Sequence, residues 1–456
     1  MNFKQFYLGC LSHASYYLGS DGEAAVIDPQ RDVQQYIDEA AANGQKIKYV
    51  IETHSHADFV SGHIELAEKT GAEIVFGHRA DTKFSTLKVR DGDELAIGGI
   101  KLKFMETPGH TPEGVTVLAD DGEGPVKMFT GDTLFIGDVG RPDLVGSWGF
   151  TAEQMGEMLY DSLHNKVLKQ PDDTEVYPAH GAGSLCGKSL SKETWSTLGE
   201  QRRLNYALQP MSREEFVKLV SADQPEVPMY FPKSAAKNLE GSVRLEDLPK
   251  PREMSTEEVL DLDGIVIDVR SSSSFGERHV PNAINISLGG QFASWAGTMI
   301  PLDTPAVIAA DTNDEVDEAF MRMARVGHEG VIGYILMKNF TGEPKTVEQI
   351  AVVEAKEKIA EGVQFIDVRR PAEHSSGHAV GAVNVPLDIL SREIDRFDPE
   401  KPTFVVCQSG YRSSLGTSIL ENAGFKKIYN VVGGTKAWMD AGLESESTQT
   451  ACAMTK

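Results

Sequence analysis

Short apolar runs separated by polar loops fill the first half of the chain. Residues 24–28 and 49–52 are apolar up to the acidic residue that ends each run, which predicts strands buried on both faces. Residues 64–69 predict a helix that ends at Gly71. Four further strands are predicted, at residues 101–105, 115–118, 126–129 and 175–177. Strands therefore alternate with helices, and polar residues follow the strand ends.

The second half contains an internal repeat with an offset of 99 residues. The run Asp268-Val269-Arg270 recurs as Asp367-Val368-Arg369. Three single residues recur at the same spacing: His279 as His378, Ala283 as Ala382, and Asn285 as Asn384. Both copies alternate strands with helices, so each predicts a small parallel α/β domain. A proline-containing stretch at residues 225–232 predicts a linker before the first copy.

Length, charge and cysteine content indicate the number of domains, the partners that are disfavoured and the cellular setting. A chain of 456 residues is too long for one core and predicts two to four domains. A formal charge of -24 disfavours binding to nucleic acids and to anionic membranes. No apolar run approaches the ~18 residues of a membrane span, and the first residues lack the order of an export signal. The four cysteines show no pairing pattern, which predicts a reducing, cytoplasmic setting.

Histidine and aspartate residues follow four of the predicted strands. They are His54, His56, Asp58, His110, Asp132 and His180, most of them beside glycine or another small residue. Loops at the ends of strands can converge on one edge of a β core, so we expect a metal site there. The spacing alone leaves open which of the six bind a metal directly.

This ordered series resembles the metallo-β-lactamase superfamily, with glyoxalase II and the persulfide dioxygenases as the nearest relatives. The resemblance covers residues 1–240 and implies an αββα sandwich. The usual superfamily pattern is H-x-H-x-D-H, but Phe59 stands where the last histidine would be. That histidine belongs to the second metal site of the dinuclear zinc members. Because a phenyl ring cannot bind a metal, a two-zinc hydrolase is disfavoured.

The resemblance to persulfide dioxygenases implies one Fe(II) per chain. The motif match assigns its ligands to His54, His110 and Asp132, a two-histidine, one-carboxylate set that suits Fe(II) oxygenases. It leaves three residues to orient water or the ligands: His56, Asp58 and His180. Arg141 matches an arginine beside the thiol substrate, and Tyr177 is expected to line the same pocket.

A second candidate site lies near the other end of the chain. Residues 402–406 predict a strand that leads into the six-residue loop Cys407-Gln408-Ser409-Gly410-Tyr411-Arg412. A helix follows at residues 413–420. The loop amides and the helix start predict an anion nest that stabilises a thiolate or a persulfide anion, and Arg412 adds positive charge. The other four loop residues are expected to contact the transferred sulfur.

The loop and its surroundings resemble the rhodanese family. The predicted boundaries are residues 242–342 for a first rhodanese-like domain and 345–445 for a second, with a flexible tail at 446–456. A six-residue loop favours a sulfur atom over a phosphate group. The first copy has Ala310 at the cysteine position and Glu315 opposite Arg412. We therefore expect it to be inactive and to have a structural role.

The domain order resembles bacterial persulfide dioxygenase–rhodanese fusion proteins. This implies that a persulfide of glutathione or a similar thiol reacts with O2 to give sulfite and thiol. A persulfide on Cys407 would then exchange sulfur between sulfite and thiosulfate. The expected partners are these small molecules, with no nucleic acid and no membrane, and homo-oligomerisation stays open.

Two other functions remain open. One is a dinuclear zinc thioester hydrolase of glyoxalase II type that carries rhodanese domains. The other is a redox-sensing or sulfur-carrier interaction protein in which Cys407 signals. Cys186, close to His180 in sequence, fits either a reactive thiol or an inert buried one.

Overall fold

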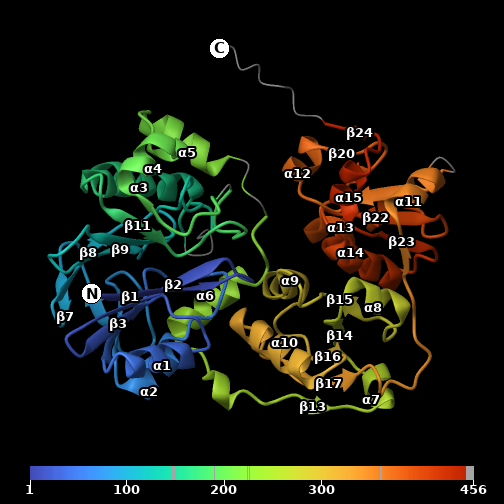
Figure 1. Cartoon of the computed structure of the whole chain (residues 1–456), viewed down its shortest axis with the longest axis horizontal. Helices are drawn as coiled ribbons and strands as arrows, with labels where there is room; N and C mark the ends of the chain where they lie inside the picture. Colours follow the sequence, from blue (N-terminus) through green and yellow to red (C-terminus); the bar gives the residue numbers. More distant parts are fainter. Residues whose placement is uncertain (145–148, 189, 223, 225, 360–361, 448–456) are drawn as a thin grey trace. The chain divides into compact units, whose positions relative to one another are not determined.

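The computed structural model of the chain describes residues 1–144, 149–188, 190–222, 224, 226–359 and 362–447. It divides into two compact units (Figure 1). The first contains residues 1–248 and 324–327, and the second contains the other described residues. No helix within the described ranges has the length and apolarity needed to cross a bilayer. Most of the predicted tail, residues 448–456, lies outside these ranges.

Two six-stranded sheets form the centre of the first unit (Figure 1). The first sheet, in spatial order, contains β1 (Asn2–Leu8), β2 (His13–Ser20), β3 (Glu23–Ile27), β4 (Lys46–Ile51), β5 (Glu73–Gly77) and β6 (Leu87–Val89). The second contains β12 (Ser196–Thr197), β11 (Glu175–Pro178), β10 (Lys127–Gly131), β9 (Val115–Asp120), β8 (Ile100–Glu106) and β7 (Glu94–Ile97). The strands predicted from the sequence are confirmed.

Helices cover the outer faces of both sheets. The α-helices of the first unit are α1 (Gln34–Ala42), α2 (His63–Thr70), α3 (Ala152–Asn165), α4 (Leu198–Leu204), α5 (Arg213–Ser221) and α6 (Phe231–Glu240). Successive side chains of a strand point to opposite faces. In β3, Ala25 and Ile27 pack between the sheets, whereas Ala24 and Val26 pack against α1 and α2. Helices α3 and α5 pack on the second sheet, which confirms the αββα sandwich.

The expected linker at residues 225–232 is wrong in its second half. Tyr230 and Phe231 are buried with their rings 5.0 Å apart, and Phe231 begins helix α6. Pro232 is tolerated in the first turn because the amide it lacks has no partner within the helix. Pro225 lies outside the described residues.

Two five-stranded parallel sheets with the same strand order make up the second unit (Figure 1). The first contains β13 (Arg252–Glu253), β17 (Val331–Leu336), β16 (Ala306–Ala310), β14 (Ile265–Asp268) and β15 (Ile284–Asn285). Its helices are α7 (Thr256–Leu260), α8 (Ser272–Glu277), α9 (Phe292–Met299) and α10 (Asn313–Arg325).

The second repeat matches this order strand for strand. Its sheet contains β18 (Glu348–Ile350), β23 (Ile428–Val431), β22 (Thr403–Val406), β19 (Gln364–Asp367) and β21 (Val383–Asn384). Its helices are α11 (Val352–Ile359), α12 (Pro371–Ser376), α13 (Leu390–Glu393), α14 (Tyr411–Asn422) and α15 (Gly434–Asp440). A separate pair contains β20 (His378–Ala379) and β24 (Ser445–Glu446). The prediction of two parallel α/β domains is confirmed.

The recurring residues make matching hydrogen bonds in the two repeats. Asp268 accepts hydrogen bonds from the guanidinium of Arg270, and Asp367 accepts them from that of Arg369. The Asn384 amide donates to the carbonyls of residues 367 and 369, as Asn285 donates to those of residues 268 and 270. These bonds fix the turn after β14 in the first repeat and the turn after β19 in the second. The sequence repeat is therefore also a repeat of local structure.

Candidate metal centre and cysteine loop

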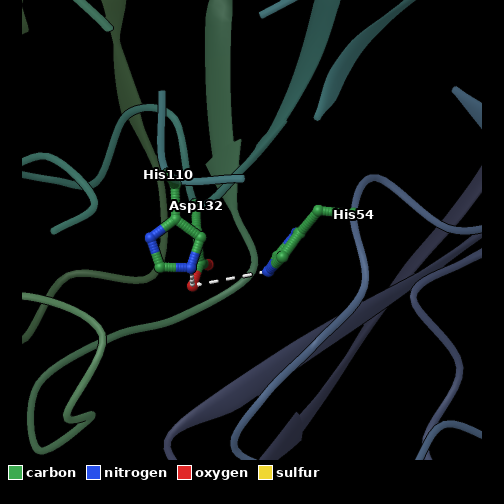
Figure 2. A group of neighbouring side chains, drawn as sticks. All are labelled: His54, His110 and Asp132. Carbon is green, nitrogen blue, oxygen red and sulfur yellow. Dashed lines mark ion pairs between the residues drawn. The ribbon is translucent and has the colours of Figure 1, made fainter. Parts of the chain in front are cut away.

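Three predicted ligands converge at the strand ends of the first unit. The Nε2 atoms of His54 and His110 lie 3.6 Å and 3.4 Å from the same carboxylate oxygen, Oδ2 of Asp132 (Figure 2). All three side chains are buried. His54 follows β4, His110 lies between β8 and β9, and Asp132 follows β10. The expected convergence of strand-end loops is what brings them together.

Neighbouring groups set the protonation of both rings. His110 donates from Nδ1 to the backbone carbonyl of Arg141, at 2.9 Å. His54 Nδ1 lies 2.9 Å from the Thr53 hydroxyl, which donates to Asp28 and therefore accepts from the ring. Each Nε2 thus carries a lone pair, and burial lowers the pKa of both histidines, which favours the neutral form.

The donor set fits a divalent metal ion. Nε2 of His54 and Oδ2 of Asp132 are buried without a hydrogen-bond partner among the described residues. Two neutral imidazoles and one carboxylate, with no fourth protein ligand required, form a set that leaves coordination positions open. These residues could therefore hold one ion and leave room for a substrate.

His180 lies behind this set. Its Nδ1 donates to Oδ1 of Asp132 at 2.7 Å, and its Nε2 lies 2.8 Å from Asp58. Burial lowers the pKa of His180, but the two carboxylates outweigh it and hold this pKa well above its usual value. Burial likewise raises the pKa of Asp132, but His180 and His54 reverse that shift and hold it well below normal. Asp132 is therefore held as a carboxylate.

His56 faces a buried acidic pair. Its Nε2 lies 3.2 Å from Asp28 and 3.5 Å from Glu52. The Phe59 ring is buried and packs against the rings of His56 and His13, with centroids 4.5 Å and 4.2 Å away. His56, Asp58 and His180 nevertheless form a second group of side chains close enough to share an ion.

Two glycines allow the strand ends to approach the histidines. A Cβ on Gly131, which has φ +52°, would lie 2.5 Å from the Thr53 hydroxyl. A Cβ on Gly140 would lie 2.9 Å from Nδ1 of His110. Both distances are shorter than real Cβ contacts, so these positions exclude larger side chains.

Arg141 and Tyr177 occupy different environments. The buried Arg141 guanidinium donates two hydrogen bonds of 2.7 Å to Asp143 and one of 3.3 Å to the Leu185 carbonyl. The Tyr177 ring lies in the core between the sheets, 5.6 Å from that of Phe129. The structure thus places Arg141 beside the His110 loop and does not bring Tyr177 to it.

The predicted cysteine loop follows β22. Cys407 is fully buried, and its Sγ accepts a hydrogen bond from the Gly410 amide at 3.2 Å and one from the Ser413 hydroxyl at 3.4 Å. Gly410 has φ +98°, a conformation that favours glycine and turns the loop into α14. The sulfur therefore faces an amide and a hydroxyl at the start of a helix, as an anion nest requires.

Arg412 is paired rather than free. Its guanidinium donates to both carboxylate oxygens of Glu373, at 2.6 Å and 2.7 Å. The Gln408 side chain accepts from Arg369 at 3.3 Å, and Ser409 is exposed. The positive charge expected at the loop is therefore oriented by an acidic partner on α12.

Comparison with known proteins agrees with this organisation. The metallo-beta-lactamase superfamily profile matches residues 8–180, and the rhodanese-like domain profile matches residues 252–336 and 351–441. The human mitochondrial persulfide dioxygenase ETHE1 is 34% identical over 214 residues, which cover 45% of this chain and 75% of the relative. The chain belongs to the metallo-β-lactamase superfamily. It consists of a metallo-β-lactamase domain with persulfide dioxygenase homologues, followed by two rhodanese-like domains.

Other relatives carry other names. A cytoplasmic hydroxyacylglutathione hydrolase of Arabidopsis thaliana is 31% identical over 245 residues, or 49% of this chain and 90% of the relative. A Staphylococcus aureus crystal structure described as a metallo-beta-lactamase matches with a TM-score of 0.67 and 32% identity. That match covers 76% of this chain and 99% of the other. Relatives of similar identity to this chain thus carry the names of two different enzymes.

The first rhodanese-like domain lacks the sulfur site. Ala310 is buried at the end of β16, the position that Cys407 occupies after β22. The Glu315 carboxylate accepts hydrogen bonds from the amides of Asp311 and Thr312, at 2.8 Å and 3.1 Å. A carboxylate of the domain itself thus occupies loop amides that would otherwise be available to an anion.

Several contacts of the two sites escaped the sequence analysis. Asp28 and Thr53 orient His54, and Glu373 orients Arg412. The sequence did point to two of these residues: Asp28 is a charged residue that ends an apolar strand, and Thr53 directly precedes the metal motif. Nothing in the sequence pointed to Glu373, because its pairing with Arg412 depends on how α12 packs against the cysteine loop.

Proposed function

We propose that this chain oxidises the persulfide of a small thiol to sulfite at a single iron and transfers sulfur through Cys407. The observation that carries the proposal is Phe59, whose buried ring stands where a second metal would need a histidine. The persulfide dioxygenase homologues support the same reaction, and the rhodanese-like domains support a sulfur substrate. The scattered cysteines favour a reducing, cytoplasmic setting.

In the oxidation, RSSH, O2 and water give RSH, sulfite and two protons. A ferrous ion held by His54, His110 and Asp132 would supply the dioxygen chemistry. The protein orients both imidazoles through Thr53 and the Arg141 carbonyl. His180 keeps the Asp132 carboxylate charged and fixed, and burial of the set limits access of water.

The transfer step needs no oxidant. The Cys407 thiolate attacks the outer sulfur of a persulfide, the S–S bond breaks, and the thiol leaves. A sulfite lone pair then attacks the sulfur carried on Cys407, which releases thiosulfate and restores the thiolate. The Gly410 amide and the Ser413 hydroxyl point at Sγ of Cys407, which holds the negative charge before the first exchange and again after thiosulfate leaves.

Oxygen uptake tests the oxidation. We expect protein loaded anaerobically with one equivalent of ferrous iron to consume O2 when glutathione persulfide is added. The sulfite and thiosulfate formed should together equal the O2 consumed. Metal analysis should find one iron per chain. Phe59→His should increase the number of metal ions bound per chain from one towards two. Hydrolysis of a glutathione thioester without O2 uptake, by a sample with two zinc ions, would establish the hydrolase instead; the group His56, Asp58 and His180 is its structural basis.

Replacement of the cysteine tests the transfer. Cys407→Ser should abolish thiosulfate–cyanide sulfur transfer and leave O2 uptake intact. Cys10→Ser is the matched control, because Cys10 lies in the metallo-β-lactamase domain, outside the loop, and should keep transfer. Transfer that survives in Cys407→Ser means that another thiol carries the sulfur.

A further inference from the structure

One stripe of helix α14 contacts the inactive first repeat. The stripe consists of Tyr411, Ser414, Ser418, Glu421 and Asn422. These positions have the spacing i, i+3, i+7, i+10 and i+11, which places them on one face of an α-helix. Their partners in the first repeat all lie within residues 279–290. A single segment of the repeat without a cysteine therefore contacts the helix that begins in the active cysteine loop.

The contact nearest the sulfur is made by Tyr411. Its hydroxyl donates to the Ser287 carbonyl at 3.0 Å. Its ring lies so close to the backbone of Gly290 that a Cβ there would be 2.6 Å from ring atom Cε2. The neighbouring Gly289 is not crowded, because a Cβ there would meet only the Ser287 hydroxyl, at 3.6 Å. Glycine at 290 thus allows the backbone of one repeat to lie against a loop residue of the other.

Asn285 makes the next contact along the helix. Its Oδ1 accepts from the Ser414 hydroxyl at 2.6 Å, and its backbone amide donates to Ser418 at 3.2 Å. Its side-chain amide donates to the carbonyls of Asp268 and Arg270, both at 3.0 Å. Asn285 is buried, so it ties the turn after β14 rigidly to the first turns of α14.

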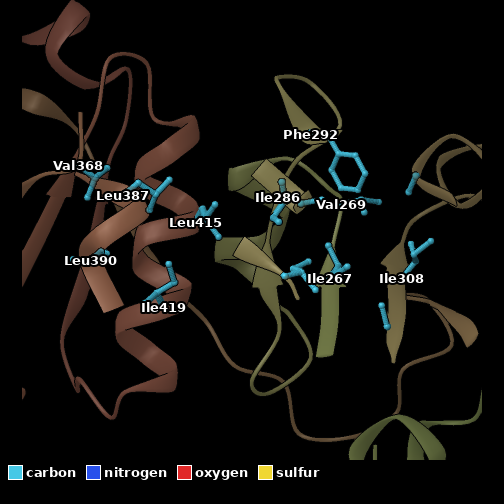
Figure 3. Packing of buried hydrophobic residues seen from close by; sticks show 14 of the residues in the cluster. Ile267, Val269, Ile286, Phe292, Ile308, Val368, Leu387, Leu390, Leu415 and Ile419 are labelled. Carbon is cyan, nitrogen blue, oxygen red and sulfur yellow. The ribbon is translucent and has the colours of Figure 1, made fainter. Parts of the chain in front are cut away.

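The far end of the stripe and the core beneath it hold the helix in place. His279 Nε2 lies 2.8 Å from the Glu421 carboxylate. Leu415 and Ile419 belong to the same buried cluster as Ile267 and Ile286 of the first repeat (Figure 3). Helix α14 is buried on every side from residue 413 to 420, so it cannot shift without disturbing both repeats.

Contacts to the sulfur and contacts to the first repeat alternate within one turn. Gly410 and Ser413 donate to Sγ of Cys407, whereas Tyr411 and Ser414 bond to the first repeat. A movement of Tyr411 or Ser414 is therefore passed directly to the two donors. Both bonds, at 3.2 Å and 3.4 Å, are within hydrogen-bonding reach of sulfur, and a shift of either donor changes them.

We propose that Asn285, Ser287 and Gly290 of the first repeat position the Cys407 loop for sulfur transfer. Tyr411 and Ser414 act as positioning residues, since they reach the sulfur only through Gly410 and Ser413. The inference rests on the proposed transfer through Cys407 and extends it: the repeat that lost its own cysteine forms part of the site of the other. Its inactive loop is not needed for this, because the contacts come from the segment after α8.

The test compares two adjacent substitutions in the full-length protein. Gly290→Ala should push the Tyr411 ring away and lower kcat for thiosulfate–cyanide transfer about tenfold or more, with KM little changed, because misplacement by about an ångström can cost that much. Gly289→Ala should leave kcat within about twofold. The rate of Cys407 alkylation by iodoacetamide should change in Gly290→Ala alone, which a simple loss of stability would not produce below the unfolding temperature.

Each outcome decides the question. If Gly290→Ala and Gly289→Ala transfer sulfur equally well, the positioning role is wrong while transfer through Cys407 stands. If Cys407→Ser keeps transfer, the proposed function fails instead. Should Gly290→Ala not fold, Ser414→Ala takes its place: it removes the bond to Asn285, and we expect kcat to fall about threefold. An unchanged kcat in a folded Ser414→Ala overturns the proposal.

Discussion

At the scale of single residues, the two histidines of the metal set depend on different kinds of neighbour. His110 is oriented by a backbone carbonyl, which no substitution of a side chain removes. His54 is oriented by the Thr53 hydroxyl, which is in turn fixed by Asp28. Asp28 has φ +51°, a rare conformation for a residue with a side chain, and it also accepts from the Thr53 amide at 2.7 Å. Because these bonds are made by side chains, they are the part of the metal site that a substitution can disrupt most easily.

Replacement of Thr53 tests that dependence. Thr53→Val keeps the shape of the side chain but leaves the His54 Nδ1–H and an Asp28 oxygen without their partner. We expect the affinity for a divalent metal to fall about 10- to 100-fold, as when other partners of metal-binding histidines are lost. Competition with a chromophoric chelator measures it. Thr53→Ser, which keeps the hydroxyl, should bind like the wild type; equal loss in both variants would contradict the role of this bond.

His63 gives the metallo-β-lactamase domain a dependence on pH. Burial lowers the pKa of His63 to about 3, with a smaller contribution from His56. The unfolded chain binds a proton near the usual value of about 6.5, so folding excludes that proton and stability falls as the pH drops below ~6.5. Between pH 6.5 and pH 5 this single group should cost about 1.5 kcal/mol.

Removal of the imidazole tests this sign. His63→Leu should flatten the decline of unfolding free energy between pH 6.5 and pH 5 by about that amount, measured in urea at each pH. The ring packs 5.2 Å from that of Phe84, so an apolar side chain suits the site. An unaltered slope would show that His63 is protonated in the folded state.

At the scale of elements, helix α6 supports the metal motif. Its residue Asn238 donates to the carbonyls of His56 and Phe59, both at 2.8 Å, and accepts from the Ser61 amide at 2.9 Å. Asn238 is buried, so all three backbone groups depend on it. The loop that carries His54 to Asp58 is thus held from outside the two sheets.

Substitution of Asn238 should therefore disturb both stability and the metal site. Asn238→Ala leaves three buried backbone groups without partners, at about 1–3 kcal/mol each before water enters, so we expect a total loss of ~3 kcal/mol or more. Urea unfolding measures the loss. Asn238→Asp keeps the acceptor for Ser61 but places a buried carboxylate against the two carbonyl oxygens, and should cost at least as much as Asn238→Ala. A loss below 1 kcal/mol in Asn238→Ala would show that the helix does not support the loop.

The same element shows where prediction from sequence stopped. Strands followed from short apolar runs, and the helix at 64–69 followed from its pattern and from Gly71, which caps it at φ +73°. The first two residues of helix α6 were taken for the end of a linker, because the prolines at 225, 228 and 232 look like breakers. The burial of the helix depends on partners about 180 residues away in sequence. Tyr177 could not be placed either, because a strand residue next to a loop motif can point to the site or to the core. The sequence motifs therefore predict which loops come together at the site. Which neighbouring residues orient the side chains of those loops depends on tertiary packing.

At the scale of the whole molecule, one hydrophobic cluster extends across both rhodanese-like repeats, beside a separate cluster in each. A buried cluster of the second unit contains residues of both, including Ile267 and Ile308 from the first and Leu390 and Leu415 from the second (Figure 3). The sequence predicted two similar domains, since each copy has its own strands and helices. It carried no sign of the shared cluster, because an apolar residue on a strand or helix does not indicate which domain it will pack against.

A shared cluster implies that the repeats unfold together. Leu415 is buried on α14, so Leu415→Ala should cost about 2–5 kcal/mol. If the repeats are one cooperative unit, hydrogen exchange of protected amides in β14 and β16 of the first repeat should speed up as much as that in β19 and β22 of the second. Lys426→Ala, at an exposed position of the second repeat, should change neither. First-repeat amides that keep their protection in Leu415→Ala would show that the repeats unfold independently, and that the contacts along α14 join two separately stable domains.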